Sequence, residues 1–185
     1  MNTARFHRGV TMVELAIALA IGALLVLLAA PSYQMWIADS QIRNAAQSVA
    51  AGLRLAQGEA IRRNEPTQFV IDPTPVTGGW TAFVVSGPVP PIMTAKFAEG
   101  ATKTTTVVGP AAATEITFSG FGRIVGNADA TGTITSIDFS SPVAGSRALR
   151  VRIGTLDAGS GLQVGNSIKL CDPAYPATDP KGCPP

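Results

Sequence analysis

The chain has 185 residues, of which 46% are hydrophobic and 14% are charged, and its formal net charge is +2. This composition excludes a charged disordered chain, because such chains combine low hydrophobicity with high net charge. It also excludes a strongly polycationic nucleic-acid binder. One His and two Cys leave almost no material for a His/Cys metal site, so we expect no bound metal.

An apolar helix near the amino terminus is the first predicted element. Residues 15–30, LAIALAIGALLVLLAA, carry no polar side chain. Extension back to Val10 adds Thr11 and Glu14 as polar positions. Residues 10–30 would form about 31 Å of helix, close to the ~30 Å hydrocarbon core of a bilayer. Because globular helices rarely stay apolar on every face for so long, we predict a transmembrane helix.

A buried core helix and a cleaved secretory signal are the alternatives. Residues 28–31, Leu-Ala-Ala-Pro, form a weak secretory cleavage site, and the helical pattern continues beyond them. Residues 1–9 carry Arg5 and Arg8 and no acid. The positive-inside rule therefore places this leader in the cytoplasm and everything after residue 30 on the other side.

The helix is predicted to continue as an amphipathic segment over residues 31–66. Its apolar residues recur at spacings of three and four and form one stripe: Ile42, Ala45, Val49, Leu53, Ala56 and Ala60. Pro31 predicts a kink rather than an end, because both flanks have a helical pattern. Arg62 and Arg63 complement the dipole at the last turn, and Pro66 disfavours further helix. We expect one helix of about fifty residues, roughly 75 Å long.

A β-rich head is predicted from Thr67 onward, where the hydrophobic periodicity shifts towards two. The candidate strands are residues 68–71, 80–85, 115–118, 133–139, 149–153 and 167–170. Pro-, Gly- and Thr-rich connections without a helical pattern favour an antiparallel sheet. Residues 88–114 give the weakest pattern, and we expect a long, mobile connection there. The predicted fold class is α+β, with the long N-terminal helix packed on an antiparallel β-sheet head, residues 67–185.

The amino-terminal sequence resembles a known processing motif. Gly9-Val10-Thr11-Met12-Val13-Glu14, between a basic leader and an apolar helix, is similar to the prepilin peptidase motif of type IV pilins and pseudopilins. The resemblance implies cleavage after Gly9 and N-methylation of Val10. It makes Glu14 the fifth mature residue and Pro31 the twenty-second, where these pilins commonly carry a helix-bending Pro. Val10 departs from the more usual Phe, and we expect slower processing at most.

The resemblance extends to the GspH/FimT family. Residues 53–64, LRLAQGEAIRRN, resemble the helix end of that family, as do Gly79-Trp80, residues 116–122 and the tail over residues 170–183. It spans most of the chain and is weak between residues 86 and 113. It implies a minor pilin or minor pseudopilin with a long helix under a β-rich head. The implied partners are prepilin peptidase, other minor and major pilins and the inner membrane.

Glu14 is the candidate assembly residue. An isolated charge in an apolar transmembrane segment costs at least ~2.5 kcal/mol, so such an acid needs a partner. In pilins the partner is taken to be the methylated amino terminus of a neighbouring subunit, here Val10. The alternative is a carboxylate close enough to the interface to reach water.

Cys171 and Cys183 are predicted to form a disulfide, because both lie on the non-cytoplasmic side of the membrane. Such a loop would stabilise the fold by about 3 kcal/mol. Their spacing excludes a Cys-x-x-Cys redox site, and zinc needs more ligands than two Cys can supply.

Catalysis has little support in the sequence. His7, the one histidine, lies in the leader that would be removed, and we find no phosphate-binding loop or Ser/His/Asp set. We therefore predict no enzyme activity and no cofactor.

Nucleic-acid binding is weighed separately, because some FimT-type pilins bind DNA through a Gly-Arg-x-Arg motif before the C-terminal Cys. Here residues 165–171 are GNSIKLC, so both arginines are missing and Lys169 remains. Arg147, Arg150 and Arg152 cluster, and strand alternation would put Arg150 and Arg152 on one face. Such a set would hold phosphates weakly, and a solvated sheet face is the favoured interpretation. Leader removal leaves 12 Lys+Arg against 12 Asp+Glu, which argues against steering by charge.

The sequence therefore predicts a FimT/FimU-like minor type IV pilin that primes pilus assembly near the tip. The amino terminus would be cytoplasmic and the head periplasmic, with later incorporation in the pilus fibre. The alternatives are a GspH-like pseudopilin of type II secretion and a DNA-binding minor pilin for natural transformation. The Cys pair favours the pilus weakly.

Overall fold

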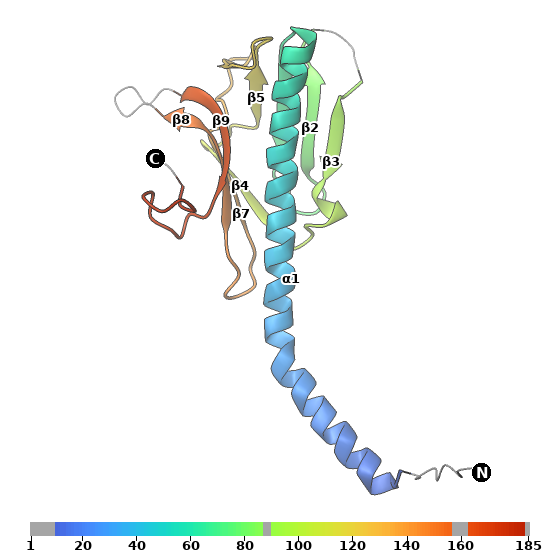
Figure 1. The fold of residues 1–185 in the computed structure, drawn as a ribbon. Helices are drawn as coiled ribbons and strands as arrows, with labels where there is room; N and C mark the ends of the chain where they lie inside the picture. Colours follow the sequence, from blue (N-terminus) through green and yellow to red (C-terminus); the bar gives the residue numbers. More distant parts are fainter. Residues whose placement is uncertain (1–9, 87–89, 157–162, 184–185) are drawn as a thin grey trace, which may run out of the picture.

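The computed structural model describes residues 10–86, 90–156 and 163–183. One long helix runs beside a head built from two antiparallel sheets (Figure 1). The helix, α1, spans Met12–Arg63. The five-stranded sheet has the order β3-β2-β1-β5-β6, and the four-stranded sheet has the order β4-β7-β8-β9. This arrangement confirms the predicted α+β class and the antiparallel pairing.

Sequence-local signals set both ends of α1. Thr11 is the N-cap, and its hydroxyl accepts a hydrogen bond from the Glu14 backbone N–H at 3.2 Å. Asn64 closes the other end in the left-handed conformation, with φ 52°. Arg62 and Arg63 both bond the Glu59 carboxylate, at 2.7 and 2.9 Å. The Arg62 hydrogen bond, followed by that of Arg63, lowers the pKa of Glu59 to about 2.

Pro31 lies inside α1, which continues on both sides of it as the sequence predicted. Figure 1 shows the helix axis bending below the head, between the segment that packs on the sheets and the N-terminal apolar segment. A proline at an interior position removes one backbone hydrogen bond and clashes with the preceding turn, which accounts for a bend at this junction.

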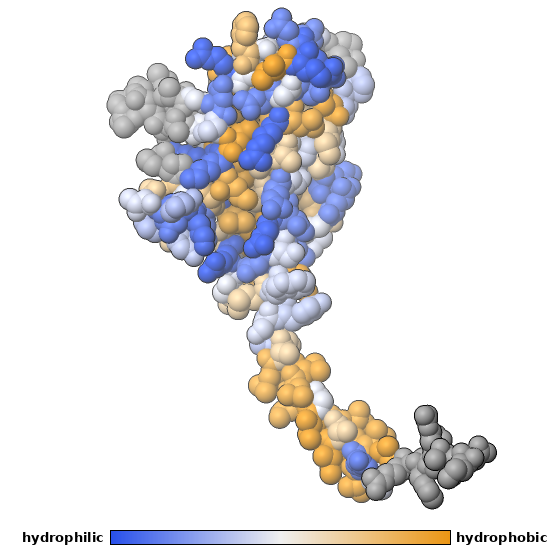
Figure 2. All heavy atoms as spheres, in the orientation of Figure 1, coloured by the Kyte–Doolittle hydropathy of each residue, from blue (hydrophilic) through white to orange (hydrophobic). Residues whose placement is uncertain are grey.

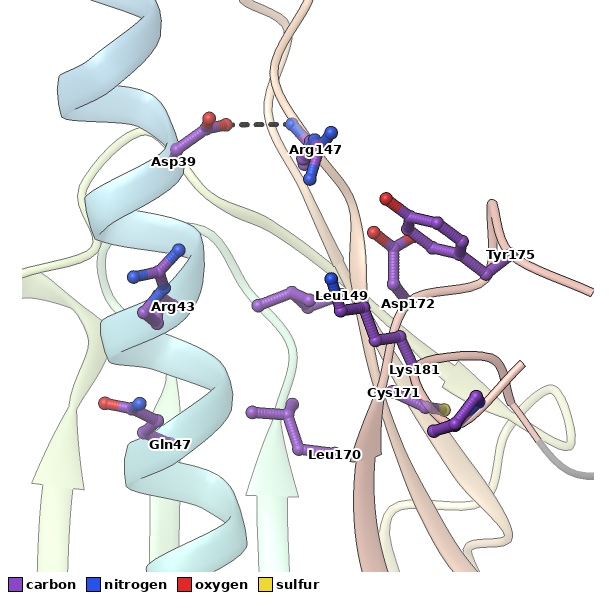
Figure 3. Close-up of a pocket in the computed structure, with 11 residues that line it drawn as sticks. Asp39, Arg43, Gln47, Arg147, Leu149, Leu170, Cys171, Asp172, Tyr175 and Lys181 are labelled. Carbon is purple, nitrogen blue, oxygen red and sulfur yellow. Dashed lines mark hydrogen bonds between the residues drawn. The ribbon is translucent and has the colours of Figure 1, made fainter.

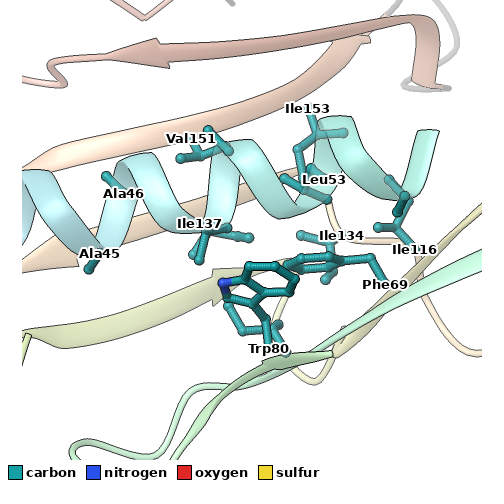
Figure 4. Close-up of a cluster of buried hydrophobic side chains, with 14 of the residues drawn as sticks. Ala45, Ala46, Leu53, Phe69, Trp80, Ile116, Ile134, Ile137, Val151 and Ile153 are labelled. Atoms are coloured by element: carbon teal, nitrogen blue, oxygen red, sulfur yellow. The ribbon is translucent and has the colours of Figure 1, made fainter. Parts of the chain in front are cut away.

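The amphipathic stripe of α1 forms one wall of the core. All six residues of the predicted stripe are buried, with at most 2% of their surface exposed. They meet aromatic and β-branched side chains from both sheets (Figure 4): Phe69, Trp80, Ile116, Phe118, Ile137, Phe139, Val151 and Ile153. Alanine and glycine dominate the helix side, which lets the backbone approach the sheets closely.

Gly52 shows how close this approach is. A Cβ at that position would lie 2.8 Å from the indole ring of Trp80. The same indole donates its Nε1–H to the Ser48 hydroxyl at 3.0 Å and stacks on Phe69. The Trp80 ring therefore fits against α1 because residue 52 has no side chain.

The five-stranded sheet begins directly after the helix. Its strands are β1 (Thr67–Asp72), β2 (Gly79–Val84), β3 (Met93–Lys96), β5 (Glu115–Phe118) and β6 (Ile124–Val125). Central β1 pairs β2 on one side and β5 on the other, with burial alternating along β1 and β2. The buried Thr67 hydroxyl donates to the Ala56 carbonyl at 2.6 Å, which ties the start of β1 to the helix.

The four-stranded sheet is assembled mostly from the C-terminal third. Its strands are β4 (Thr105–Gly109), β7 (Ser136–Ser140), β8 (Leu149–Leu156) and β9 (Gln163–Cys171). The predicted strand over residues 133–139 is shifted: β7 begins at Ser136, while Thr133 forms an isolated bridge with Glu115. Strands β8 and β9 extend beyond their predicted ranges.

The expectation of a long, mobile connection over residues 88–114 was wrong. The described residues of this range contain β3, a 3₁₀ turn η1 (Phe97–Glu99) and β4. Phe97 is buried against Phe139, with ring centroids 6.4 Å apart, and β4 pairs β7. The pattern was unreadable because β3 is an edge strand that buries none of its residues, so it carries no hydrophobic alternation.

Candidate functional site

The amino-terminal end of α1 carries the predicted processing and assembly residues. Gly9 lies outside the described residues, so the cleavage position itself is not placed. Val10 and Thr11 are exposed ahead of the first helical turn, and Glu14 lies within that turn. Among the described residues, no hydrogen bond or ion pair engages the Glu14 carboxylate. This acid is therefore available to a group from outside the chain.

An uncovered apolar surface extends from this end to the base of the head. Every residue from Met12 to Trp36 is exposed, and the large apolar side chains show between 37% and 90% of their surface. Figure 2 shows this segment as a nearly continuous apolar rod below a mixed head. It is long and apolar enough to cross a membrane. A solvent-exposed surface of this extent marks a membrane or protein contact.

The four cations considered for DNA binding do not form one patch. Val151 and Ile153 are buried, so Arg150 and Arg152 point to the outer face of β8, as alternation predicted. Arg150 is held by Asp138 on β7, with Nε to Oδ1 2.6 Å and Nη2 to Oδ2 2.9 Å. The hydrogen bond that Arg150 donates to the Asp138 carboxylate raises the pKa of Arg150.

Arg152 and Lys169 are cross-strand neighbours on β8 and β9 and make a smaller cationic pair on that outer face. Arg147 lies elsewhere, because it precedes the first residue of β8 and so falls outside the alternation. Its backbone N–H donates to Asp39 Oδ1 of α1 at 2.8 Å. The structure therefore leaves two of the four cations side by side and without an ion-pair partner among the described residues.

The predicted disulfide is present. Cys171 and Cys183 are bonded, with their Cα atoms 5.0 Å apart. Inside the loop, the Asp172 N–H donates to the Lys181 carbonyl at 2.8 Å, and the Lys181 ammonium lies 5.9 Å from the centroid of the Tyr175 ring. The disulfide loop, residues 172–182, is thus closed at its base and packed on itself.

Two polar features were missed by sequence reasoning. One is an open cavity of about 500 Å³ between α1 and the disulfide loop. The sequence signal for it is a row of polar residues at intervals of four on α1, beside the apolar stripe: Asp39, Arg43 and Gln47. The cavity could not be located from this row, because its other walls come from residues 147–181, about 100 residues or more along the chain.

The second feature is a buried amide network beside β5. The Asn127 side chain accepts from the Thr117 hydroxyl at 3.0 Å and donates to the Glu115 carbonyl at 3.3 Å. The Thr131 hydroxyl lies 2.9 Å from Glu115 and 2.7 Å from Asp129. Burial raises the pKa of Glu115, while the Thr131 hydroxyl hydrogen bond lowers that of Asp129. These contacts fix the loop before β7 and need no ligand to explain them.

Metal binding has no support in the described ranges: no three His, Cys, Asp or Glu side chains among residues 10–86, 90–156 and 163–183 are grouped so as to hold an ion.

Comparisons with known proteins identify both the head and the amino-terminal segment of the chain. Residues 45–157, more than half of the chain, match the family model of the type II transport protein GspH. The chain belongs to the GspH family. Residues 5–30 of this GspH-family protein match the prokaryotic N-terminal methylation motif. No curated protein and no solved structure matches the chain.

The two matches fall on the two regions that the structure distinguishes. The methylation motif covers the capped start of α1 and the uncovered apolar segment, and the GspH match covers the packed part of α1 and most of the head. The protein is therefore a type IV pilin-like minor component of the GspH/FimT kind. Pilin and pseudopilin families are structural components rather than enzymes. The apolar helix and the motif fit a membrane-anchored pilin.

Proposed function

We propose that this chain is a minor type IV pilin that is cut after Gly9, methylated at Val10 and built into the pilus near its tip. There it would prime polymerisation together with other minor pilins. The observation that carries the proposal is the uncovered apolar half of α1, which ends at a carboxylate without a partner among the described residues. A subunit with this surface is stable only in a bilayer or packed against other apolar helices.

Insertion into the inner membrane is the first step. The basic leader stays in the cytoplasm, residues 10–30 span the bilayer, and residues 31–66 join them to the periplasmic head, residues 67–185. An oxidising periplasm suits the disulfide between Cys171 and Cys183. Removal of the leader by prepilin peptidase then exposes the new amino terminus at Val10.

Assembly is the second step. Glu14 lies four residues after Val10, so a neighbouring subunit displaced by about one helical turn can bring its methylated amino terminus to this carboxylate. The pairing neutralises an acid that is costly in lipid and so favours extraction of the subunit into a bundle of apolar helices. The Pro31 bend then sets the angle between this bundle and the head.

Replacement of Gly9 tests the proposal. In a strain carrying the full-length Gly9→Val variant, we expect the chain to accumulate as an uncut precursor, and the intact mass should include residues 1–9. Piliation should fall, as it should in a Glu14→Gln variant that is cut normally. A Gly9→Val chain with the mature mass would contradict the proposed processing.

A GspH-like minor pseudopilin of type II secretion is the second candidate, favoured by the family model that matches the head. The two candidates differ in phenotype. Deletion of a minor pilin should remove surface pili and leave secreted enzymes in the medium, whereas deletion of a pseudopilin should do the reverse.

DNA binding for natural transformation is less favoured. Asp138 already engages Arg150, and Arg147 lies away from the pair formed by Arg152 and Lys169. Arg152 and Lys169 alone would give weak, strongly salt-dependent binding. A gel shift with the full-length protein in detergent that stays negative at low salt would remove this candidate.

A further inference from the structure

The open cavity between α1 and the disulfide loop has no role in the assembly steps above. Its walls come from α1, from the segment before β8, from the end of β9 and from residues 172–182 (Figure 3). Its volume of about 500 Å³ lies within the usual range of ligand pockets, about 300–1,000 Å³. It is large enough to receive a few side chains of a partner.

Three cations from three separate segments line this cavity: Arg43 on α1, Arg147 before β8 and Lys181 in the disulfide loop. Within the described part of the chain, none of them lies within 4.0 Å of a carboxylate oxygen. The guanidinium groups of Arg43 and Arg147 also make no hydrogen bond to a described residue. Their charges are therefore available to an anionic ligand.

The two acids of the cavity are already engaged. Asp39 Oδ1 accepts the Arg147 backbone N–H at 2.8 Å, and Asp172 Oδ1 accepts the Ala174 backbone N–H at 2.9 Å. These bonds shape the walls and leave three cations facing two carboxylates. The local balance favours a negatively charged occupant.

The floor of the cavity is apolar. Leu149 and Leu170 pack against the hydrophobic core. Figure 3 shows their side chains directed towards α1. They lie between Arg43 and Gln47 on one side and the disulfide loop on the other. The ring of Tyr175 adds an aromatic wall. A bare inorganic anion gains nothing from this floor, whereas a peptide that carries carboxylates beside apolar side chains uses both surfaces.

The position of the cavity favours a protein ligand over a lipid. Arg43 lies 13 residues beyond residue 30, about 20 Å along the helix, whereas a headgroup layer adds about 5–8 Å to each side of the hydrocarbon core. Asp39, Arg43 and Gln47 also continue the exposed surface of α1 upward from the uncovered apolar segment. The cavity therefore opens beside the part of α1 that directly follows the surface on which neighbouring subunits would pack.

We propose that the cavity is a docking site for an acidic peptide segment of a neighbouring pilin subunit, whose carboxylates pair with Arg43, Arg147 and Lys181. The inference rests on the proposed function, since it requires neighbours along α1. The disulfide contributes by fixing the loop that carries Lys181 and Tyr175, so the cavity depends on the Cys171–Cys183 bond.

Photocrosslinking in intact cells tests this docking with the full-length chain. Tyr175 is replaced by the photoreactive amino acid benzoylphenylalanine, with the same replacement at the exposed Phe121 as a control outside the cavity. We expect position 175 to crosslink another pilin through a peptide that contains Asp or Glu.

Charge reversal gives the matched comparison. The Arg43→Glu/Arg147→Glu pair should lower the yield at position 175 at least about tenfold, because like charges would meet. The Arg152→Glu/Lys169→Glu pair, with the same charge change on the outer face, should lower it less than about twofold. Exchange of the crosslinked acid for Lys in the partner should restore the yield with the first pair.

The outcomes separate docking from the proposed function. A chain that keeps its leader, by intact mass, contradicts the proposed function. A processed chain in assembled pili overturns the docking alone if position 175 gives no pilin crosslink, gives lipid or nucleic-acid adducts, or joins a peptide without an acid. An equal loss of yield with both charge-reversal pairs overturns it as well.

Discussion

The two halves of α1 belong to one continuous helix but have opposite surroundings. Below the head, Met12 to Trp36 are exposed and mostly large and apolar. Beside the head, the buried face of α1 is made mainly of Ala, together with Ile42, Val49, Gly52 and Leu53. The first half keeps its large side chains for partners outside the chain, whereas the second uses small ones to bring the backbone against two sheets. Side-chain size, more than hydrophobicity, distinguishes the uncovered surface from the face of α1 that is buried in the core.

Truncation of one leucine in each half should give the largest contrast. Leu53 is fully buried, so Leu53→Ala should lower the free energy of unfolding by about 2–5 kcal/mol. Leu24 is 61% exposed, and Leu24→Ala should change it by less than about 0.5 kcal/mol. Denaturant titration of the full-length protein in detergent, followed by tryptophan fluorescence, measures both. Equal losses of unfolding free energy in the two variants would contradict the difference between the two halves of α1.

Loss of the disulfide should weaken the head and spare the apolar half. The Cys171→Ser/Cys183→Ser variant should lose about 3 kcal/mol, since the bond restricts the unfolded chain. The same titration, with and without reductant, should show wild type shifting to the variant's midpoint. Membrane extraction should be unchanged; a variant that no longer inserts would link the two regions more closely than the structure indicates.

The same Gly→Ala change at three positions of α1 compares its packed half with its uncovered half more finely. Gly52→Ala should cost about 1–3 kcal/mol, because its Cβ would clash with Trp80. Gly58, also in the packed half, has no atom within 4 Å of an added Cβ, so Gly58→Ala should stabilise the helix by up to about 1 kcal/mol. Gly22→Ala has open space as well and should leave the head unchanged. A stabilising Gly52→Ala would contradict the close packing.

The smallest effect should come from the acid at the C-terminal end of α1. Because the folded-state pKa of Glu59 is lowered from 4.5 to about 2, its ion pairs contribute stability above pH 4.5 and lose it as the pH falls towards 2. The Arg62 side chain is 63% exposed, so salt should reduce the contribution. Compared with wild type, Glu59→Gln should show a flatter stability profile between pH 4.5 and 2. Parallel profiles would contradict this assignment.

Much of the helix was predictable because its signals are local. Its length, the stripe from Ile42 to Ala60 and the continuation through Pro31 follow from periodicity and capping rules. The disulfide was predictable because the chain has two Cys and both were expected on the non-cytoplasmic side of the membrane. The strand β5, residues 115–118, was also predicted with its observed bounds.

The remainder required long-range information. β4 pairs β7, which follows about thirty residues later, and exposed β3 has no alternating pattern to detect. Arg147 was grouped with Arg150 and Arg152 because they are neighbours in sequence. It separates from them because β8 begins two residues later, at Leu149. The cavity appears only when α1 and the disulfide loop meet in the folded chain.

The intact mass and amino-terminal sequence of the chain recovered from sheared surface pili test the central claim most directly. We predict a chain that begins at Val10, carries one N-methyl group and retains the Cys171–Cys183 disulfide. A chain absent from the fibres, or one that still carries residues 1–9, would contradict the assignment of the uncovered half of α1 to pilus assembly.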